Sequence, residues 1–185
     1  MATTYDGGKS YLTTALASMP DIAVNYMFVV EFDMTGSKLP NKEEFANLTV
    51  KARSAIIPGR STEPIESNFM GSKQLYPGKT TYTNEVPIRI EEFQDGGTHA
   101  LLKGWQDAIY NPITGVRISN YKKDYSARLI VTVMGTDGKV IGEPIVFETA
   151  WLKNVGEPAL DHDSSDKIVF DATLAFDRWH YASEV

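Results

Sequence analysis

The chain of 185 residues contains no cysteine, and its apolar residues never form a long uninterrupted run. The lack of cysteine excludes disulfides, thiolate metal sites and cysteine nucleophiles. No stretch approaches the roughly 20 apolar residues that cross a bilayer, and the N-terminus lacks the apolar block of a signal peptide. We therefore expect folding in a reducing cytoplasm, without export and without membrane anchoring.

Basic residues are outnumbered by acidic ones. Lys and Arg total 18 against 24 Asp and Glu, which gives a net charge of −6. Such a surface repels phosphate groups and lacks the basic footprint of a nucleic-acid-binding protein. If DNA comes close to this protein, we expect it not to bind.

Residues arranged for catalysis or nucleotide binding are scarce. His99 and His180 have no serine elbow or carboxylate partner nearby in the sequence. The segment Gly78-Lys79-Thr80 matches the end of a phosphate-binding loop, but Lys73 stands where that motif needs its first glycine. The sequence therefore predicts neither an enzyme nor a cofactor.

One acidic cluster, Asp161, His162, Asp163 and Asp166, has the residue types of a calcium site. It lacks the glycine and the distal glutamate of a calcium loop, and Asp and Ser are typical of any exposed turn. We favour a turn without a metal. A calcium-dependent binding module, or a hydrolase on a β-sandwich, stays open as an alternative of another class.

Hydrophobic periodicity predicts several strands and one helix. Leu101, Leu102, Trp105, Ala108 and Ile109 recur at helical spacing, with Thr98 placed to cap the start of the helix and Asn111-Pro112 to end it. Asp137-Gly138 is a hairpin signal. Strands are expected over 25–33, 48–56, 86–93, 128–135, 139–151 and from 167 onward. These elements indicate a mainly β fold: an antiparallel β-sandwich or barrel with one α-helix packed on its outside, in a single domain spanning 1–185.

Two segments fit the core less well. Residues 1–24 form a polar N-terminal arm, and residues 57–84 form an irregular loop with several prolines and glycines. This loop also carries apolar side chains that need a surface to bury them: Ile57, Ile65, Phe69, Met70, Leu75 and Tyr76. Either the loop folds over its own core, or it packs on a neighbouring subunit.

The last third of the chain holds the most regular pattern. From Lys167 onward the even positions, Ile168 to Phe176, are apolar, which predicts one long half-buried strand on the order of 35 Å. Its opposite face is small or polar and consists of Asp171, Thr173, Ala175 and Asp177. Among the tryptophans, Trp105 lies on the apolar face of the helix, while Trp151 and Trp179 fit either core or subunit interface.

Several of these segments together resemble the tail tube proteins of contractile-tailed bacteriophages. The similarity covers most of the chain. It lies in NYMFVVEFD, ARSAIIPG, LLKGWQDAIYNPITG and above all AWLKNVGEPALDHDSSDKIVFDATLAFDRW.

The resemblance implies a structural virion protein that forms stacked hexameric rings, with strands of all six subunits joined in a β-barrel around the bore. The expected partners are further copies of the chain and the tail sheath, tape measure, baseplate and tail terminator proteins. DNA is expected to pass through the bore without specific binding, after assembly of the tail in the host cytoplasm. On this view the loop 57–84 contacts adjacent subunits and rings, and Asp171, Thr173, Ala175 and Asp177 are candidates for the bore. The tube of a DNA-free contractile particle, such as a tailocin or a secretion system, is the alternative.

Overall fold

The computed structural model describes residues 23–117, 120–158, 160–163 and 165–184. The core of the protein is a seven-stranded antiparallel sheet with neighbours in the order β1-β6-β7-β8-β5-β2, and β9 pairs with β7. Its strands are β1 (Phe28–Asp33), β2 (Ala52–Ala55), β5 (Glu85–Glu91), β6 (Ala127–Val133), β7 (Ile145–Val155), β8 (Val169–Ala175) and β9 (Arg178–Tyr181). The predicted mainly β, antiparallel fold is confirmed.

Strand β7 turns the sheet into a sandwich. Its first half, up to Ala150, pairs with β6 and β9, whereas Trp151 to Val155 pair with β8. Thr149 at this change of partner has φ of 51°, unusual for a β-branched residue. The two halves of the sheet enclose one apolar core, which includes Val30, Leu129, Phe147, Ile88 and Leu174.

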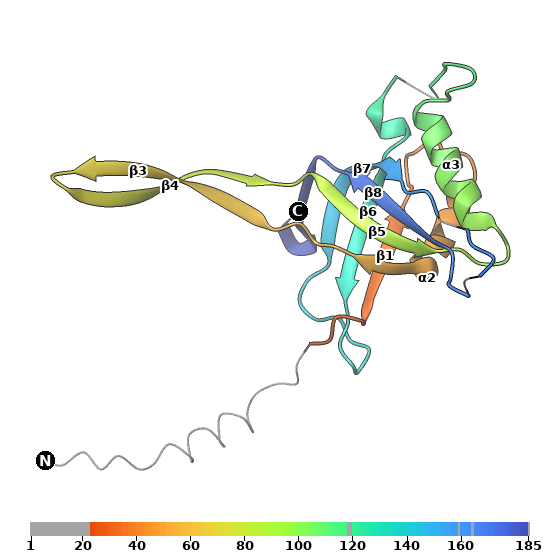
Figure 1. Ribbon diagram of the computed structural model, residues 1–185, viewed down its shortest axis with the longest axis horizontal. Coiled ribbons are helices and arrows are strands. Elements are labelled where there is room, and N and C mark those ends of the chain that lie inside the picture. The colour runs from red at the N-terminus through yellow and green to blue at the C-terminus, as the bar shows by residue number, and fades with distance from the viewer. Residues whose placement is uncertain (1–22, 118–119, 159, 164, 185) are drawn as a thin grey trace, which may run out of the picture.

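The long helix α3 (Gly97–Ile109) lies at the end of the sandwich away from the β3–β4 hairpin (Figure 1). Leu101, Leu102 and Trp105 are buried, as their spacing predicts. The predicted cap is wrong, because Thr98 is buried and its hydroxyl donates to the Glu91 carbonyl. Glu92 caps the helix instead, since its carboxylate accepts the backbone N–H groups of Thr98 at 3.1 Å and His99 at 2.9 Å.

The predicted strand over 48–56 is partly wrong. The chain forms the 3₁₀ turn η1 (Lys42–Phe45) and the short helix α2 (Ala46–Lys51) before β2 begins. Leu48 is buried while Val50 is exposed, so the alternation does not describe two faces of a strand. Phe45, Leu48 and Lys51 are the buried positions, three residues apart, which is helical spacing.

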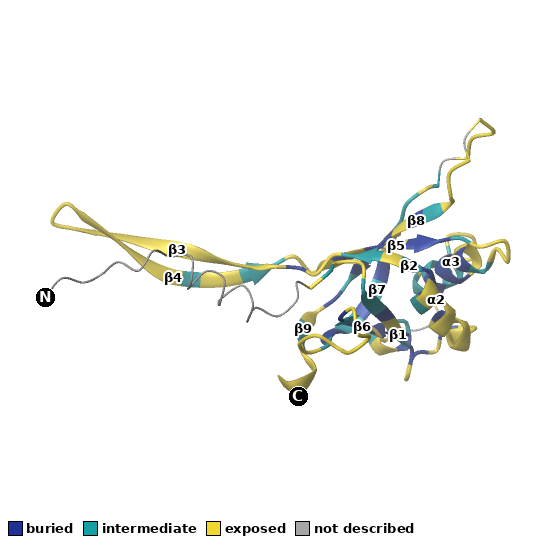
Figure 2. Cartoon of the chain, turned by 90° about the horizontal axis from the view of Figure 1, so that it is seen from below, coloured by how far each residue is buried: buried dark blue, intermediate teal, exposed yellow. Residues whose placement is uncertain are grey.

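The predicted irregular loop is also wrong, because residues 60–82 form a two-stranded hairpin with one register shift, between Thr62 and Pro64. Strands β3 (Arg60–Phe69) and β4 (Ser72–Tyr82) pair along their length and project from the sandwich (Figures 1 and 2). Pro64 and Pro77, which suggested a loop, stand opposite each other in this ladder. A ribbon of two edge strands tolerates proline, because each strand has a side that needs no hydrogen bond.

The single long C-terminal strand divides into two. Strand β8 has seven residues, the chain then bends at Phe176 and Asp177, and β9 follows. At the bend the N–H of Phe176 donates to the Asn84 carbonyl at 3.0 Å, and that of Asp177 donates to the Glu148 carbonyl at 3.2 Å. The predicted alternation is confirmed from Phe170 to Phe176, but Ile168 is 40% exposed.

The turn at Asp137-Gly138 forms as predicted, with an N–H···O bond from Gly138 to Gly135 and an isolated bridge between Met134 and Val140. Strand β7, however, starts only at Ile145 and runs on to Val155. Three short 3₁₀ turns complete the elements: η1, η2 (Lys122–Asp124) and η3 (Ala182–Glu184). No helix in the described part of the chain is long and apolar enough to cross a membrane.

Candidate assembly surfaces

Four strand segments present one continuous outward face, which we call the outer face. It belongs to β2, β5, β8 and the second half of β7, whose opposite sides fill the core. Directly paired residues form three rows across it: Ser54, Arg89 and Asp171; Pro87, Thr173 and Asn154; Glu85, Ala175 and Trp151. Asp171, Thr173 and Ala175 from the sequence analysis therefore occupy one row each.

Asp177 does not belong to the outer face, because it lies beyond the end of β8. Its carboxylate accepts hydrogen bonds from the Lys122 ammonium and the Thr149 hydroxyl, and these, the Lys122 bond above all, lower its pKa. Asp177 thus holds the bend between β8 and β9 against η2 and β7. Its placement on one strand face with Asp171 was wrong, because the strand ends at Ala175.

The charged side chains of the outer face are paired with one another. The Arg89 guanidinium forms an ion pair with the Asp171 carboxylate at 2.9 Å, and Lys153 forms an ion pair with Glu85. Glu91, which is buried, is held between Arg53 and Lys167. The hydrogen bonds from Lys167 first and Arg53 second lower the pKa of Glu91, so it stays ionised under these cations.

Both edges of this four-stranded segment lack a ladder partner in the described part of the chain. Strand β2 pairs only with β5, and β7 from Trp151 to Val155 pairs only with β8. Unpaired strand edges are a template for pairing with another chain. The outer face is therefore bounded by two edges that can join copies of the protein side by side.

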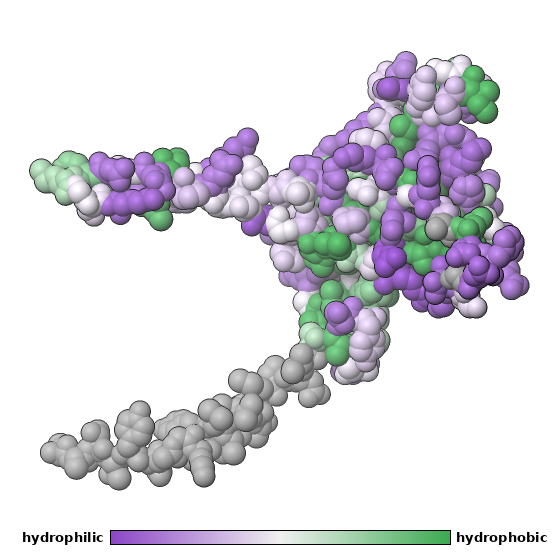
Figure 3. Space-filling view, viewed as in Figure 1, coloured by the Kyte–Doolittle hydropathy of each residue, from purple (hydrophilic) through white to green (hydrophobic). Residues whose placement is uncertain are grey.

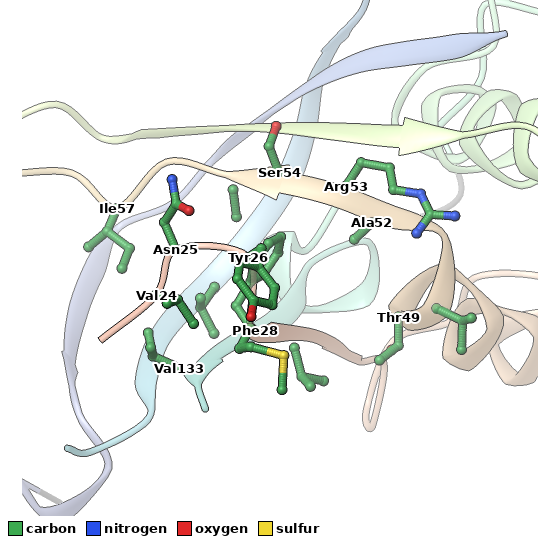
Figure 4. Close-up of a pocket in the computed structure, with 15 residues that line it drawn as sticks. Val24, Asn25, Tyr26, Phe28, Thr49, Ala52, Arg53, Ser54, Ile57 and Val133 are labelled. Carbon is green, nitrogen blue, oxygen red and sulfur yellow. The ribbon is translucent and has the colours of Figure 1, made fainter. Parts of the chain in front are cut away.

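A groove runs beside the edge of β2. It has a volume of about 890 Å³ and lies between β2 and the segment that leads into β1 (Figure 4). Val24, Tyr26, Phe28, Ile57 and Val133 give it a largely apolar lining. Tyr26 is 69% exposed and Ile57 40%, so apolar surface is left open along the edge.

The hairpin β3–β4, which we call the arm, has two chemically different faces. Cross-strand partners point the same way. One face carries only uncharged side chains, Ile65, Ser67, Phe69, Ser72, Gln74 and Tyr76, and we call it the uncharged arm face. The other carries the Glu66–Lys73 ion pair together with Leu75. Figure 3 shows apolar residues at the tip and along the arm between polar ones.

The tip of the arm combines exposure with backbone strain. Met70 and Gly71 form a two-residue turn with φ of 47° and 77°. Such turns favour Asn-Gly, because a residue with a bulky side chain is disfavoured at positive φ. Met70 is nevertheless 92% exposed, so it gains little from burial in its own chain. A strained, exposed methionine at this place fits a contact with another molecule better than a role in folding.

The base of the arm is anchored to the sandwich. The Arg60 guanidinium lies 4.2 Å from the centre of the Trp179 ring, and Tyr82 stacks on Phe176. The side-chain amide of Asn84 donates to the Phe176 carbonyl at 3.0 Å. Sequence reasoning missed Arg60 and Asn84, because their partners lie about a hundred residues away and no local pattern marks them.

The three tryptophans have different surroundings. Trp105 is core: it is 1% exposed, its Nε1 donates to the Tyr125 carbonyl at 2.7 Å, and Phe45 packs edge-on against its ring. Trp151 is half-buried and stands in a row of the outer face, and Trp179 is half-buried at the base of the arm. Both of these remain candidates for subunit contacts.

The acidic cluster behaves as a turn. Asp161 accepts the N–H of Asp163 at 3.0 Å, a typical local turn bond of aspartate. Among the described residues no group of three or more His, Asp or Glu side chains is placed to hold a metal ion. The hypothesis of a calcium module therefore gains no support from the geometry.

The six apolar residues at 57–84 lie in four different places. Ile65, Phe69 and Tyr76 share the uncharged arm face, and Leu75 lies on the opposite face. Met70 lies at the tip of the arm, and Ile57 lines the groove.

Comparison with known proteins gives close relatives. The tail tube protein gp19 of Enterobacteria phage T4 is 30% identical over 164 residues, which is 86% of this chain and 91% of that protein. The tail tube protein gp19 of Enterobacteria phage T6 is 29% identical over the same coverage. No protein-family model matches.

Several solved structures share the fold. A chain in the baseplate of the anti-feeding prophage, a structure with imposed sixfold symmetry, superposes with a TM-score of 0.63 at 11% identity, over 88% of this chain and 97% of that one. A chain in the sheath–tube complex of an extracellular contractile injection system in its extended state gives 0.57 at 20% identity, over 91% and 96%. At these identities the likeness concerns the fold alone.

Proposed function

The chain belongs to the family of phage tail tube proteins, and on this premise we propose that it forms hexameric rings that stack into the inner tube of a contractile tail. The tube would guide DNA out of the virion, inside the sheath. Its role is mechanical and not enzymatic. Its partners would be further copies of itself together with the sheath, tape measure, baseplate and tail terminator proteins, on a tail assembled in the host cytoplasm.

The observation that carries the ring is the pair of unpaired edges of the outer face. Strand β2 of one subunit meets the Trp151 to Val155 segment of the next, and repetition around a sixfold axis closes a barrel. Closure removes the exposed edges, which are a liability in a single subunit. It also covers the apolar groove beside β2 with the adjacent subunit, and the outer face then lines the bore.

The arm supplies contacts beyond the subunit's own surface. Ten residues of β3 extend about 33 Å at the usual rise of a strand. Since the arm continues from β2 and β5, its direction follows the strands of the proposed barrel wall (Figures 1 and 2). We propose that the uncharged arm face and Met70 pack on subunits of the adjacent ring, which would bury Ile65, Phe69 and Tyr76.

Electron microscopy tests the assembly. Concentrated purified protein, or protein added to baseplates as initiators, is expected to give rings and tubes. A protein that stays monomeric and never adds to an initiated tube contradicts the proposal.

Cysteine cross-linking tests the edge contact, because the natural chain has no cysteine. Ser54→Cys on β2 combined with Asn154→Cys or Lys153→Cys on β7 places thiols on the two edges. Oxidation is expected to give a ladder of covalent species that ends at six. The matched control pairs Ser54→Cys with Glu43→Cys on η1, which is exposed and belongs to neither strand edge. Equal cross-linking of control and test pairs would refute the edge-to-edge contact.

A further inference from the structure

The outer face has a charge balance unlike that of the whole chain. Its four strand segments carry three basic and three acidic residues: Arg53, Arg89 and Lys153, and Glu85, Glu91 and Asp171. A fourth cation, Lys167, precedes β8 and pairs with Glu91. The local sum on these strands is therefore zero, and it is +1 with Lys167 included, against −6 for the whole chain. The net negative charge of the protein lies elsewhere, and the outer face alone has enough cations to contact several phosphates.

Each of these cations faces a carboxylate. Asp171 stands directly opposite Arg89 in the β5–β8 ladder, and Glu85 reaches Lys153 across β8. Glu91 serves two cations, with Lys167 at 2.8 Å and Arg53 on its other side. All charged residues of the outer face are thus engaged in these three groups.

The exposed ion pairs Arg89–Asp171 and Lys153–Glu85 are not explained by a contribution to folding stability. The side chains of Arg89 and Asp171 are 61% and 69% exposed, and those of Lys153 and Glu85 are 48% and 46% exposed. Ion pairs in such positions contribute little to folding. They do determine the charge that a polyanion meets at the face, because Lys and Arg bind phosphates by releasing counterions unless a carboxylate already neutralises them.

We propose that Glu85, Glu91 and Asp171 mask Arg53, Arg89, Lys153 and Lys167 and so prevent the outer face from binding double-stranded DNA. The inference rests on the proposed function, in which this face lines the bore. There, unmasked cations would hold the DNA by its phosphates, whereas paired cations let it slide. The three carboxylates thus determine specificity by preventing the outer face from binding DNA.

The test removes two carboxylates at exposed positions. The double variant Glu85→Gln with Asp171→Asn frees Lys153 and Arg89, and the control Glu43→Gln with Glu44→Gln changes the net charge equally on exposed positions of η1. Binding of a short fluorescent DNA duplex is measured by anisotropy at several salt concentrations, below the concentration at which the protein assembles. Circular dichroism verifies folding of each variant.

The wild type and the control are expected to bind weakly with similar salt dependence. In the double variant the plot of log affinity against log salt should steepen by about 1.8, because two freed cations each contribute about 0.9. Adding Arg89→Gln to the double variant should remove about half of that increase. Equal slopes in the double variant and the control would overturn the inference, as would tight binding by the wild type.

Failure of the inference is distinguishable from failure of the proposed function. Tubes seen for the wild type together with unchanged slopes refute the masking alone. Tubes of the double variant that take up duplex should protect it from nuclease, since the face lies inside. Binding without protection would place the outer face outside the bore and contradict the proposed ring.

Discussion

Met70 at the tip of the arm should have opposite effects on the stability of the folded chain and on the association of subunits, and a single substitution tests both. Replacement Met70→Asn creates Asn-Gly, the pair best suited to a turn in which both central residues have positive φ. A bulky residue in the left-handed region costs roughly 1–2 kcal/mol, and asparagine avoids much of that cost. In the unassembled protein, the arm of the Met70→Asn variant should therefore be more ordered than that of the wild type.

Assembly should respond in the opposite direction. Met70 is 92% exposed in the single chain, so nearly its whole side chain is available for burial against another subunit. Full burial of a methionine contributes about 1.5–3 kcal/mol. Its loss corresponds to a roughly ten- to hundredfold weaker association for each tip contact, and in a ring every subunit loses one.

The assay follows tube growth by light scattering and electron microscopy as a function of protein concentration, and the order of the arm by hydrogen exchange of its amides. Met70→Leu is the matched control, because leucine keeps the apolar surface and the strained turn, and it should assemble like the wild type. If Met70→Asn grows tubes at the same protein concentration as the wild type, Met70 makes no contact that contributes to assembly.

Three further substitutions, at two positions, probe helix α3 and its packing. Glu92→Gln should cost about 1 kcal/mol of unfolding free energy in urea denaturation at neutral pH, because the carboxylate that accepts the N–H groups of Thr98 and His99 is lost. Burial acts to raise the pKa of Glu92, but these hydrogen bonds outweigh it and the pKa is lowered in the folded protein. The stabilisation by the Glu92 carboxylate is therefore fully present above the ordinary glutamate pKa of about 4.5, and it disappears as the pH falls through the lowered pKa. The unfolding free energies of the wild type and Glu92→Gln should then converge in acid. A difference that persists there would contradict the capping role. Trp105→Ala should destabilise by about 3–5 kcal/mol, since it empties a fully buried site. Trp105→Phe should cost about 1–3 kcal/mol, because it leaves the Tyr125 carbonyl without its donor, and a neutral result in thermal unfolding would show that water replaces that bond.

Patterns within one element were readable from the sequence. The alternation from Phe170 to Phe176 predicts which side of β8 is buried, and the helical spacing around Trp105 predicts the buried side of α3. Both succeed because the period of a strand or helix is set by its own backbone geometry. The glycine at the Asp137-Gly138 turn likewise acts locally, through its positive φ of 76°.

Errors arose where a short run fits two periods or where distant residues decide. The run 48–52 alternates like a strand, yet Phe45 and Leu48 pack as a helix because the core needs them there. The prolines of the arm suggest a loop, and only pairing between Pro64 and Pro77 makes them part of a ribbon. Glu92 caps α3 from outside the helix, where no capping motif in the sequence marks it.

The amino-acid sequence by itself determined the mainly β class, the long helix and the overall acidity. These properties depend on composition and on neighbours along the chain. Only the tertiary structure decided that β2 and the end of β7 are unpaired edges, and that Arg89 meets Asp171 and Lys153 meets Glu85 on one face. Such partners lie 68 to 82 residues apart in the sequence. Strand register brings them together, and register depends on the packing of the whole core and not on any one segment.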